Sequence, residues 1–115
     1  MSIRTVLSAT AVFLIAAPAF AQDAGWIGIV IGDRTDRGAV VRSVEPNSPA
    51  AKANLKEGDV ILEFNKEQVI GAQQLTRLVR ETPAGRAVEV KIRRDNREQT
   101  LQVTTERAPN RFDNL

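Results

Sequence analysis

The pattern of apolar and polar positions along the chain predicts a set of short strands. Residues 88–93 alternate apolar and charged side chains, which is typical of a half-exposed strand. Residues 99–104 alternate in the same way, and the polar residues 94–97 between them predict a hairpin turn. Continuous apolar or β-branched runs predict further strands at 27–31, 38–44, 60–64 and 69–70. The last of these is a brief return strand.

Two helices are predicted, one by its ends and one by its periodicity. In the segment 47–55, Ser48 is a good N-cap, Pro49 suits the first helical position, and Asn54 tolerates the left-handed conformation that ends a helix. A second helix is expected from 71–72 to about Thr82. Its apolar positions follow the i, i+3, i+4, i+7 spacing of one helix face, namely Leu75, Leu78, Val79 and Thr82. Two interpretations of that face stay open: it is all core, Leu78 in particular, or it forms the wall of a binding site.

A glycine turn at the start of the first strand is the candidate functional element. The run from Trp26 to Gly32 is apolar, and Gly28 lies just inside it. Without a Cβ, Gly28 lets the backbone turn sharply and leave its amides outward, where they can attract an anion such as a carboxylate. If the following strand has a free edge, the end of another peptide could add to it as an extra strand. An ordinary buried strand is the simpler interpretation of these residues alone.

Composition excludes several classes of protein. The chain has no cysteine and no histidine, so a Ser-His-Asp or Cys-His enzyme is impossible within it, and neither a disulfide nor the commonest zinc ligand is present. The formal net charge is only +2, with basic and acidic residues interspersed, and aromatic residues are few, so nucleic acid is not an expected partner. We expect no cofactor, no metal site and no catalytic residue.

The N-terminal segment is typical of an export signal. Arg4 precedes the apolar run 6–17, and Ala19-Phe20-Ala21 is a small-x-small cleavage site, which together predict a bacterial secretory signal peptide at 1–21. The run is shorter than the ~20 residues of a membrane span. We therefore expect a periplasmic or secreted mature protein, with membrane association only if the signal stays uncleaved.

The ordered set of elements resembles a PDZ domain, specifically the circularly ordered form found in HtrA/DegP-type proteases. The most specific block is Ser48-Pro49-Ala50-Ala51-Lys52-Ala53 followed by residues 55–62, and Trp26-Ile27-Gly28-Ile29 is similar to the family's carboxylate-binding loop. The resemblance implies an α+β fold, a small PDZ-like partly open β-barrel or sandwich of about five to six strands capped by two helices. The domain that it implies occupies 26–106. The polar residues 22–25 predict a short lead, and Pro109 and a low apolar content predict a disordered tail at 107–115.

The resemblance also implies a site, residue by residue. The carboxylate loop and edge strand would be Trp26, Ile27, Gly28, Ile29, Val30 and Ile31, and the helix wall would be Leu75, Leu78, Val79 and Thr82. An aliphatic side chain at the end of a peptide would enter between them. Three departures from the family pattern stand out: Asn54 replaces a glycine, Lys66 follows Asn65 where Asn-Gly is usual, and Asp23 lies in the lead where many relatives carry a basic residue.

Three functions follow as hypotheses. The first is a free-standing, exported, non-catalytic module that captures protein C-termini or extended apolar segments, as an adaptor or sensor in protein quality control or secretion. The second is a regulatory subunit of a separate periplasmic protease or secretion complex. The third is a scaffold that forms a homodimer through the exposed edge at 29–31.

Overall fold

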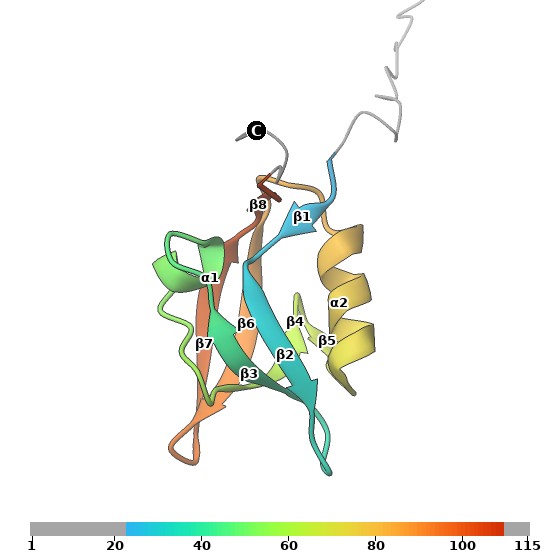
Figure 1. Ribbon diagram of the computed structural model, residues 1–115. Helices are drawn as coiled ribbons and strands as arrows, with labels where there is room; N and C mark the ends of the chain where they lie inside the picture. Colours follow the sequence, from blue (N-terminus) through green and yellow to red (C-terminus); the bar gives the residue numbers. More distant parts are fainter. Residues whose placement is uncertain (1–22, 110–115) are drawn as a thin grey trace, which may run out of the picture.

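The computed structural model describes residues 23–109, so the predicted signal peptide and residues 110–115 of the predicted tail lie outside the described residues. Eight strands and two helices follow one another in this part of the protein (Figure 1). In sequence order they are β1 (Gly25–Trp26), β2 (Ile29–Asp33), β3 (Ala39–Val44), α1 (Pro49–Lys52), β4 (Val60–Phe64), β5 (Glu67–Gln68), α2 (Ala72–Glu81), β6 (Ala87–Arg94), β7 (Arg97–Thr104) and β8 (Glu106–Arg107).

The strands form two antiparallel sheets. The larger has the order β2-β3-β4-β6-β7, with β5 paired to β4, and the smaller consists of β1 and β8. Figure 1 shows β2 at the edge of the large sheet with α2 beside it, while β1 and β8 lie together at one end of the molecule. The predicted α+β class with two helices is confirmed. The sheets are not closed into a barrel. The structure has eight strands instead of the expected five to six, because β1, β5 and β8 are strands of two residues, too short to show a sequence pattern.

The core lies between the large sheet and the two helices. Its members are aliphatic except for one phenylalanine, and they come from β3, α1, β4, α2, β6, β7 and three loops: Ile27, Ala39, Val41, Ala50, Leu55, Ile61, Phe64, Val69, Leu75, Leu78, Val88, Val90, Ile92 and Val103. The alternation predicted for 88–93 is seen in β6, where Val88, Val90 and Ile92 are buried and the charged residues between them are not. Burial of each large aliphatic member stabilises the fold by about 1.5–3 kcal/mol.

Helix α1 begins and ends where the capping residues predict. Ser48 Oγ accepts the Ala51 N–H at 3.2 Å, and Pro49 occupies the first helical position. Asn54 has φ 66°, the left-handed conformation expected for the residue that follows the helix. The helix itself is only four residues long, because Ala53 already leaves the helical geometry.

The turn before β5 explains why the return strand differs from the prediction. Asn65 and Lys66 have φ values of 49° and 67°, both in the left-handed region that a two-residue hairpin turn requires. Pairing therefore resumes at once, with Phe64 opposite Glu67 and Glu63 opposite Gln68. The predicted return strand at 69–70 was wrong by two positions; Val69 still bonds β4 through its N–H to Leu62 O at 2.9 Å, and Ile70 is exposed.

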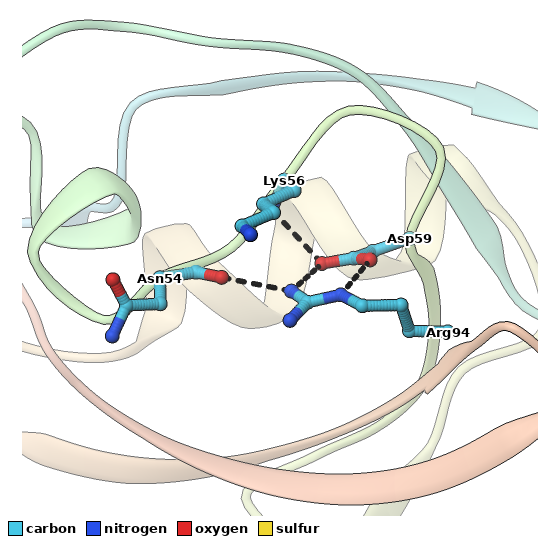
Figure 2. A network of polar contacts seen from close by, with 4 residues as sticks. All are labelled: Asn54, Lys56, Asp59 and Arg94. Atoms are coloured by element: carbon cyan, nitrogen blue, oxygen red, sulfur yellow. Dashed lines mark hydrogen bonds and ion pairs between the residues drawn. The ribbon is translucent and has the colours of Figure 1, made fainter.

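A buried ion pair fixes the loop before β4 to the end of β6 (Figure 2). Asp59, only 2% exposed, accepts hydrogen bonds from Arg94 Nε at 2.8 Å and Nη2 at 2.6 Å, and from the Lys56 N–H at 2.8 Å. Arg94 Nη2 also donates to Asn54 O at 2.8 Å. The hydrogen bond with Asp59 raises the pKa of the Arg94 guanidinium. Because both carboxylate oxygens have a donor, the pair links two segments without leaving an unsatisfied charge.

Candidate functional site

The loop between β1 and β2 is held in place through its carbonyl groups. Ile27 O accepts the Ala50 N–H at 2.9 Å, and Gly28 O accepts the Glu45 N–H at 2.8 Å. Gly28 has φ 79°, and a Cβ there would overlap the Ser48 side chain. Only glycine allows this left-handed turn and this close approach together. The loop therefore packs directly on the start of α1.

The amide groups of the same loop are not used internally. Within residues 23–109, the N–H groups of Ile27 and Gly28 have no hydrogen-bond acceptor, whereas the preceding Gly25 N–H donates to Thr82 O at 2.6 Å. A backbone donor without a partner in the protein must be satisfied by water or by a ligand. Two neighbouring donors in a glycine turn form a small concavity suited to an anion.

The strand that follows has one open edge. Among the described strands β2 pairs only with β3, and its other edge faces α2 (Figure 1). Because the Glu45 N–H bonds Gly28 O, the facing pair Ile29 and Val44 is of the non-hydrogen-bonded kind. The Ile29 N–H and C=O therefore point away from β3, toward the helix, and can pair with an added strand.

A groove of about 450 Å³ lies between this edge and α2. This size is within the range of ligand-binding pockets. It is lined by the loop, by the inner side of β2, by one face of α2 and by the residue after β8: Ala24, Gly25, Trp26, Ile27, Gly28, Ile29, Ile31, Leu75, Thr76, Val79, Arg80 and Ala108. The lining is mainly apolar, with fully buried Leu75 at its base. Arg80 is the one charged side chain among these residues.

Most of the residues that the sequence analysis selected line this groove. Trp26, Ile27, Gly28, Ile29 and Ile31 do so from the loop and β2, and Leu75 and Val79 do so from α2. Their role as peptide-binding residues stays a prediction. The geometry brings the two predicted walls together, because the β1–β2 region and α2 are joined by the hydrogen bond between Gly25 and Thr82.

Three selected residues lie elsewhere. Val30 is 53% exposed and points away from the groove lining, as alternation along a strand requires. Leu78 is 8% exposed and, with Thr82, borders a different depression next to Phe64. Thr82 serves the backbone instead, since its Oγ1 donates to Leu78 O at 2.8 Å and its carbonyl holds Gly25. For Leu78 the core interpretation was therefore the better one.

The sequence analysis missed two helix residues that line the groove, Thr76 and Arg80. They lie on the same helix face as Val79, so the helical period contained the signal. Both are polar, whereas the predicted wall rested on apolar positions only. Asp23, which stands in the lead where many relatives carry a basic residue, pairs with Arg107: Asp23 Oδ2 lies 3.5 Å from Arg107 Nε. The positive charge in the groove comes instead from Arg80 on α2.

Residues 23–109 contain no cluster of three or more potential metal-ligating His, Cys, Asp or Glu side chains. In the same range, no helix is both long and apolar enough to span a membrane.

Comparison with known proteins shows the family. The family model for the PDZ domain matches residues 25–105, so the chain belongs to the PDZ domain family. A probable periplasmic serine endoprotease DegP-like from Marinomonas sp. (strain MWYL1) is 38% identical over 96 residues, covering 74% of this chain and 20% of that protein. The chain thus spans about a fifth of the length of this relative.

Two solved structures are similar in fold. The HtrA-type protease AlgW with tripeptide matches with a TM-score of 0.70 and 25% identity, over 80% of this chain and 35% of that one. The HtrA3 PDZ domain bound to a phage-derived ligand (FGRWV) matches with a TM-score of 0.64 and 23% identity, over 71% of this chain and 85% of that one. Together, the DegP-like relative and AlgW identify the domain as one of the HtrA type.

Proposed function

We propose that this protein is a non-catalytic module that binds the C-terminal or extended apolar segment of another polypeptide by strand addition to β2. One observation carries the proposal: the open edge of β2 runs along an apolar groove and begins at a turn whose Ile27 and Gly28 amides have no acceptor within the described residues. A carboxylate in the turn, main-chain pairing with Ile29 and a side chain in the groove would use all three features.

The energetics fit weak, reversible recognition. An aliphatic side chain buried between Ile29 and Val79 contributes about 1.5–3 kcal/mol. Micromolar affinity requires about 8 kcal/mol, so main-chain pairing and the carboxylate contacts must supply most of the remainder. We expect dissociation constants in the micromolar range for peptides with Val, Leu, Ile, Ala or Phe at the end.

The similar proteins support this assignment and suggest where in the cell the protein acts. The HtrA3 PDZ domain holds a phage-derived peptide ending in valine, and AlgW was solved with a tripeptide. The DegP-like relatives are periplasmic serine endoproteases. By analogy we place this module in the periplasm or among secreted proteins, as an adaptor or sensor of exposed polypeptide ends in protein quality control.

A groove-filling substitution tests the proposal. Thr76 is half-buried and lines the groove, so Thr76→Trp should fill it and weaken binding of an aliphatic-ended peptide at least tenfold by calorimetry. Thr100→Trp introduces the same side chain at an exposed position of β7 and should change binding less than twofold. If a panel of such peptides does not bind the wild-type protein, or if both variants bind equally well, the proposed function is wrong.

A regulatory role beside a separate catalytic protein is the second candidate, favoured by the protease relatives. In that case the groove would receive the end of the partner or of its substrate. Proteolytic activity that co-purifies with the wild-type protein, and not with Thr76→Trp, would support this role. A homodimer through β2 is distinguished by light scattering, since it would dissociate when a groove-binding peptide is added.

A further inference from the structure

Arg80 lies where two depressions of the surface meet. The groove described above is continuous with a second depression of about 440 Å³, which extends along α2 and is lined by Ile31, Ala72, Gln73, Thr76, Arg77, Arg80 and Glu81. Ile31, Thr76 and Arg80 line both. Of the three, only Arg80 carries a charge, so it is the cation that faces both spaces.

Arg80 has no partner of its own within residues 23–109. No ion pair or side-chain hydrogen bond involves its guanidinium there, whereas Arg77, on the preceding turn, lies 3.9 Å from Glu81. Asp23, which precedes the groove-lining Ala24, already pairs with Arg107. Arg80 therefore places a positive charge in the same groove as the unpaired amides of Ile27 and Gly28.

We propose that Arg80 pairs with a carboxylate of the bound peptide, and that it selects acidic ligands where this carboxylate belongs to a side chain; the inference rests on the proposed function. Two carboxylates could meet it. One is the terminal carboxylate of the peptide at the Gly28 turn, and the other is an acidic side chain further back in the peptide. In an added strand, the residue two positions before the last points the same way as the last one. It would therefore enter the second depression, on the other side of Arg80.

The size of the effect follows from the exposure of Arg80. Ion pairs between exposed groups contribute up to about 1 kcal/mol, which corresponds to about fivefold in affinity. Partial removal of water by the bound peptide strengthens the pair, so a three- to tenfold loss is expected for Arg80→Gln. The same difference should shrink as salt is raised from about 0.05 M to about 0.5 M, because exposed charges are screened.

The experiment uses a matched pair of variants and three peptides. Arg80→Gln and Arg97→Gln remove the same charge from α2 and from the exposed start of β7, and Arg97 lines neither of the two depressions. The first peptide has an aliphatic last residue, a free C-terminus and Asp two positions before the end. The second has Asn in place of that Asp, and the third has an amidated C-terminus. Affinities come from calorimetry at both salt concentrations.

The outcomes separate the inference from the function on which it rests. The expected result is a three- to tenfold loss with Arg80→Gln on the first peptide and less than twofold with Arg97→Gln. If that loss disappears with the Asn peptide, the partner is the side chain; if it disappears with the amidated peptide, the partner is the C-terminus. Wild-type binding with equal affinities for both variants overturns the inference and leaves the proposed function standing, and the absence of any wild-type binding overturns both.

Arg80→Glu provides the reverse test. The charge-reversed variant should bind the Asp peptide more weakly than Arg80→Gln does. It should also regain affinity for a peptide with Lys at the same position, provided that the side chain is the partner. If the Asp peptide binds Arg80→Glu as well as it binds the wild-type protein, no charge pairing occurs at Arg80.

Discussion

Removing the guanidinium of Arg94 should strongly destabilise the domain, and Arg94→Met is the sharpest way to do so. The substitution keeps the aliphatic part of the side chain but takes two of the three donors from the Asp59 carboxylate, leaving it with the Lys56 N–H alone. Asp59 is 2% exposed, so its charge would remain buried without compensation. Breaking a buried pair in this way costs about 3–5 kcal/mol.

The lower end of that range is the better estimate for this pair. The Arg94 side chain is 22% exposed, so water can enter part of the space that the guanidinium leaves. We therefore expect a loss of about 3 kcal/mol in the free energy of unfolding. For a small domain the urea dependence is about 1 kcal/mol per molar, which places the unfolding midpoint about 3 M lower.

The controls decide whether the loss comes from the buried charge. Lys52→Met breaks the Lys52–Glu106 pair at 3.0 Å, whose side chains are 64% and 43% exposed, and should cost less than about 0.5 kcal/mol. The double variant Asp59→Leu with Arg94→Met should be more stable than the sum of the single losses by about 2 kcal/mol, because no lone charge remains. Strict additivity, or a loss with Arg94→Met no larger than that of Lys52→Met, would refute this reasoning.

Two further predictions follow from the turn before β5 and from an ionic cluster on the large sheet. Lys66 has φ 67°, so Lys66→Gly should relieve strain and raise the free energy of unfolding by about 0.5–1 kcal/mol in urea titrations; a decrease would contradict this. Hydrogen bonds to Glu98 and Glu63 raise the pKa of Lys91 in the folded protein. The stability that these bonds contribute should therefore be fully present below pH about 10.4, the pKa of an unfolded lysine, and be lost as the pH rises through the higher pKa of the folded state. NMR titration should show a lower Lys91 pKa in Glu98→Gln, and an unchanged value would exclude Glu98 as the cause.

The sequence predicted those elements whose signal is local. The capping residues Ser48 and Pro49 located α1, and alternation located β6 and β7, because each pattern is written within a few neighbouring residues. The pairing of Gly25 with Arg107 joins residues from opposite ends of the described range, in strands too short to show any period. Such a contact depends on the finished tertiary structure and could not be predicted from local patterns.

The residues of the candidate site were also predicted only in part, because local patterns do not show how α2 is oriented. Periodicity identifies the apolar stripe of α2, but it does not say which border of the stripe meets the core and which meets β2. Leu78 turned out to lie on the core side, whereas polar Thr76 and Arg80 lie on the groove side. Only the orientation of the helix relative to β2, fixed in part by the bond between Gly25 and Thr82, makes that distinction.

The pairing of β1 with β8 has a practical consequence for attaching labels or supports. It brings the entry and the exit of the domain to the same pole as the Gly28 turn, and Ala108 itself borders the groove (Figure 1). A fluorophore or surface tether fused near either end would therefore crowd the mouth of the groove. The turn at Asp95 and Asn96, between β6 and β7 at the opposite pole, is the better anchoring point, because a tether there leaves the groove facing the solution.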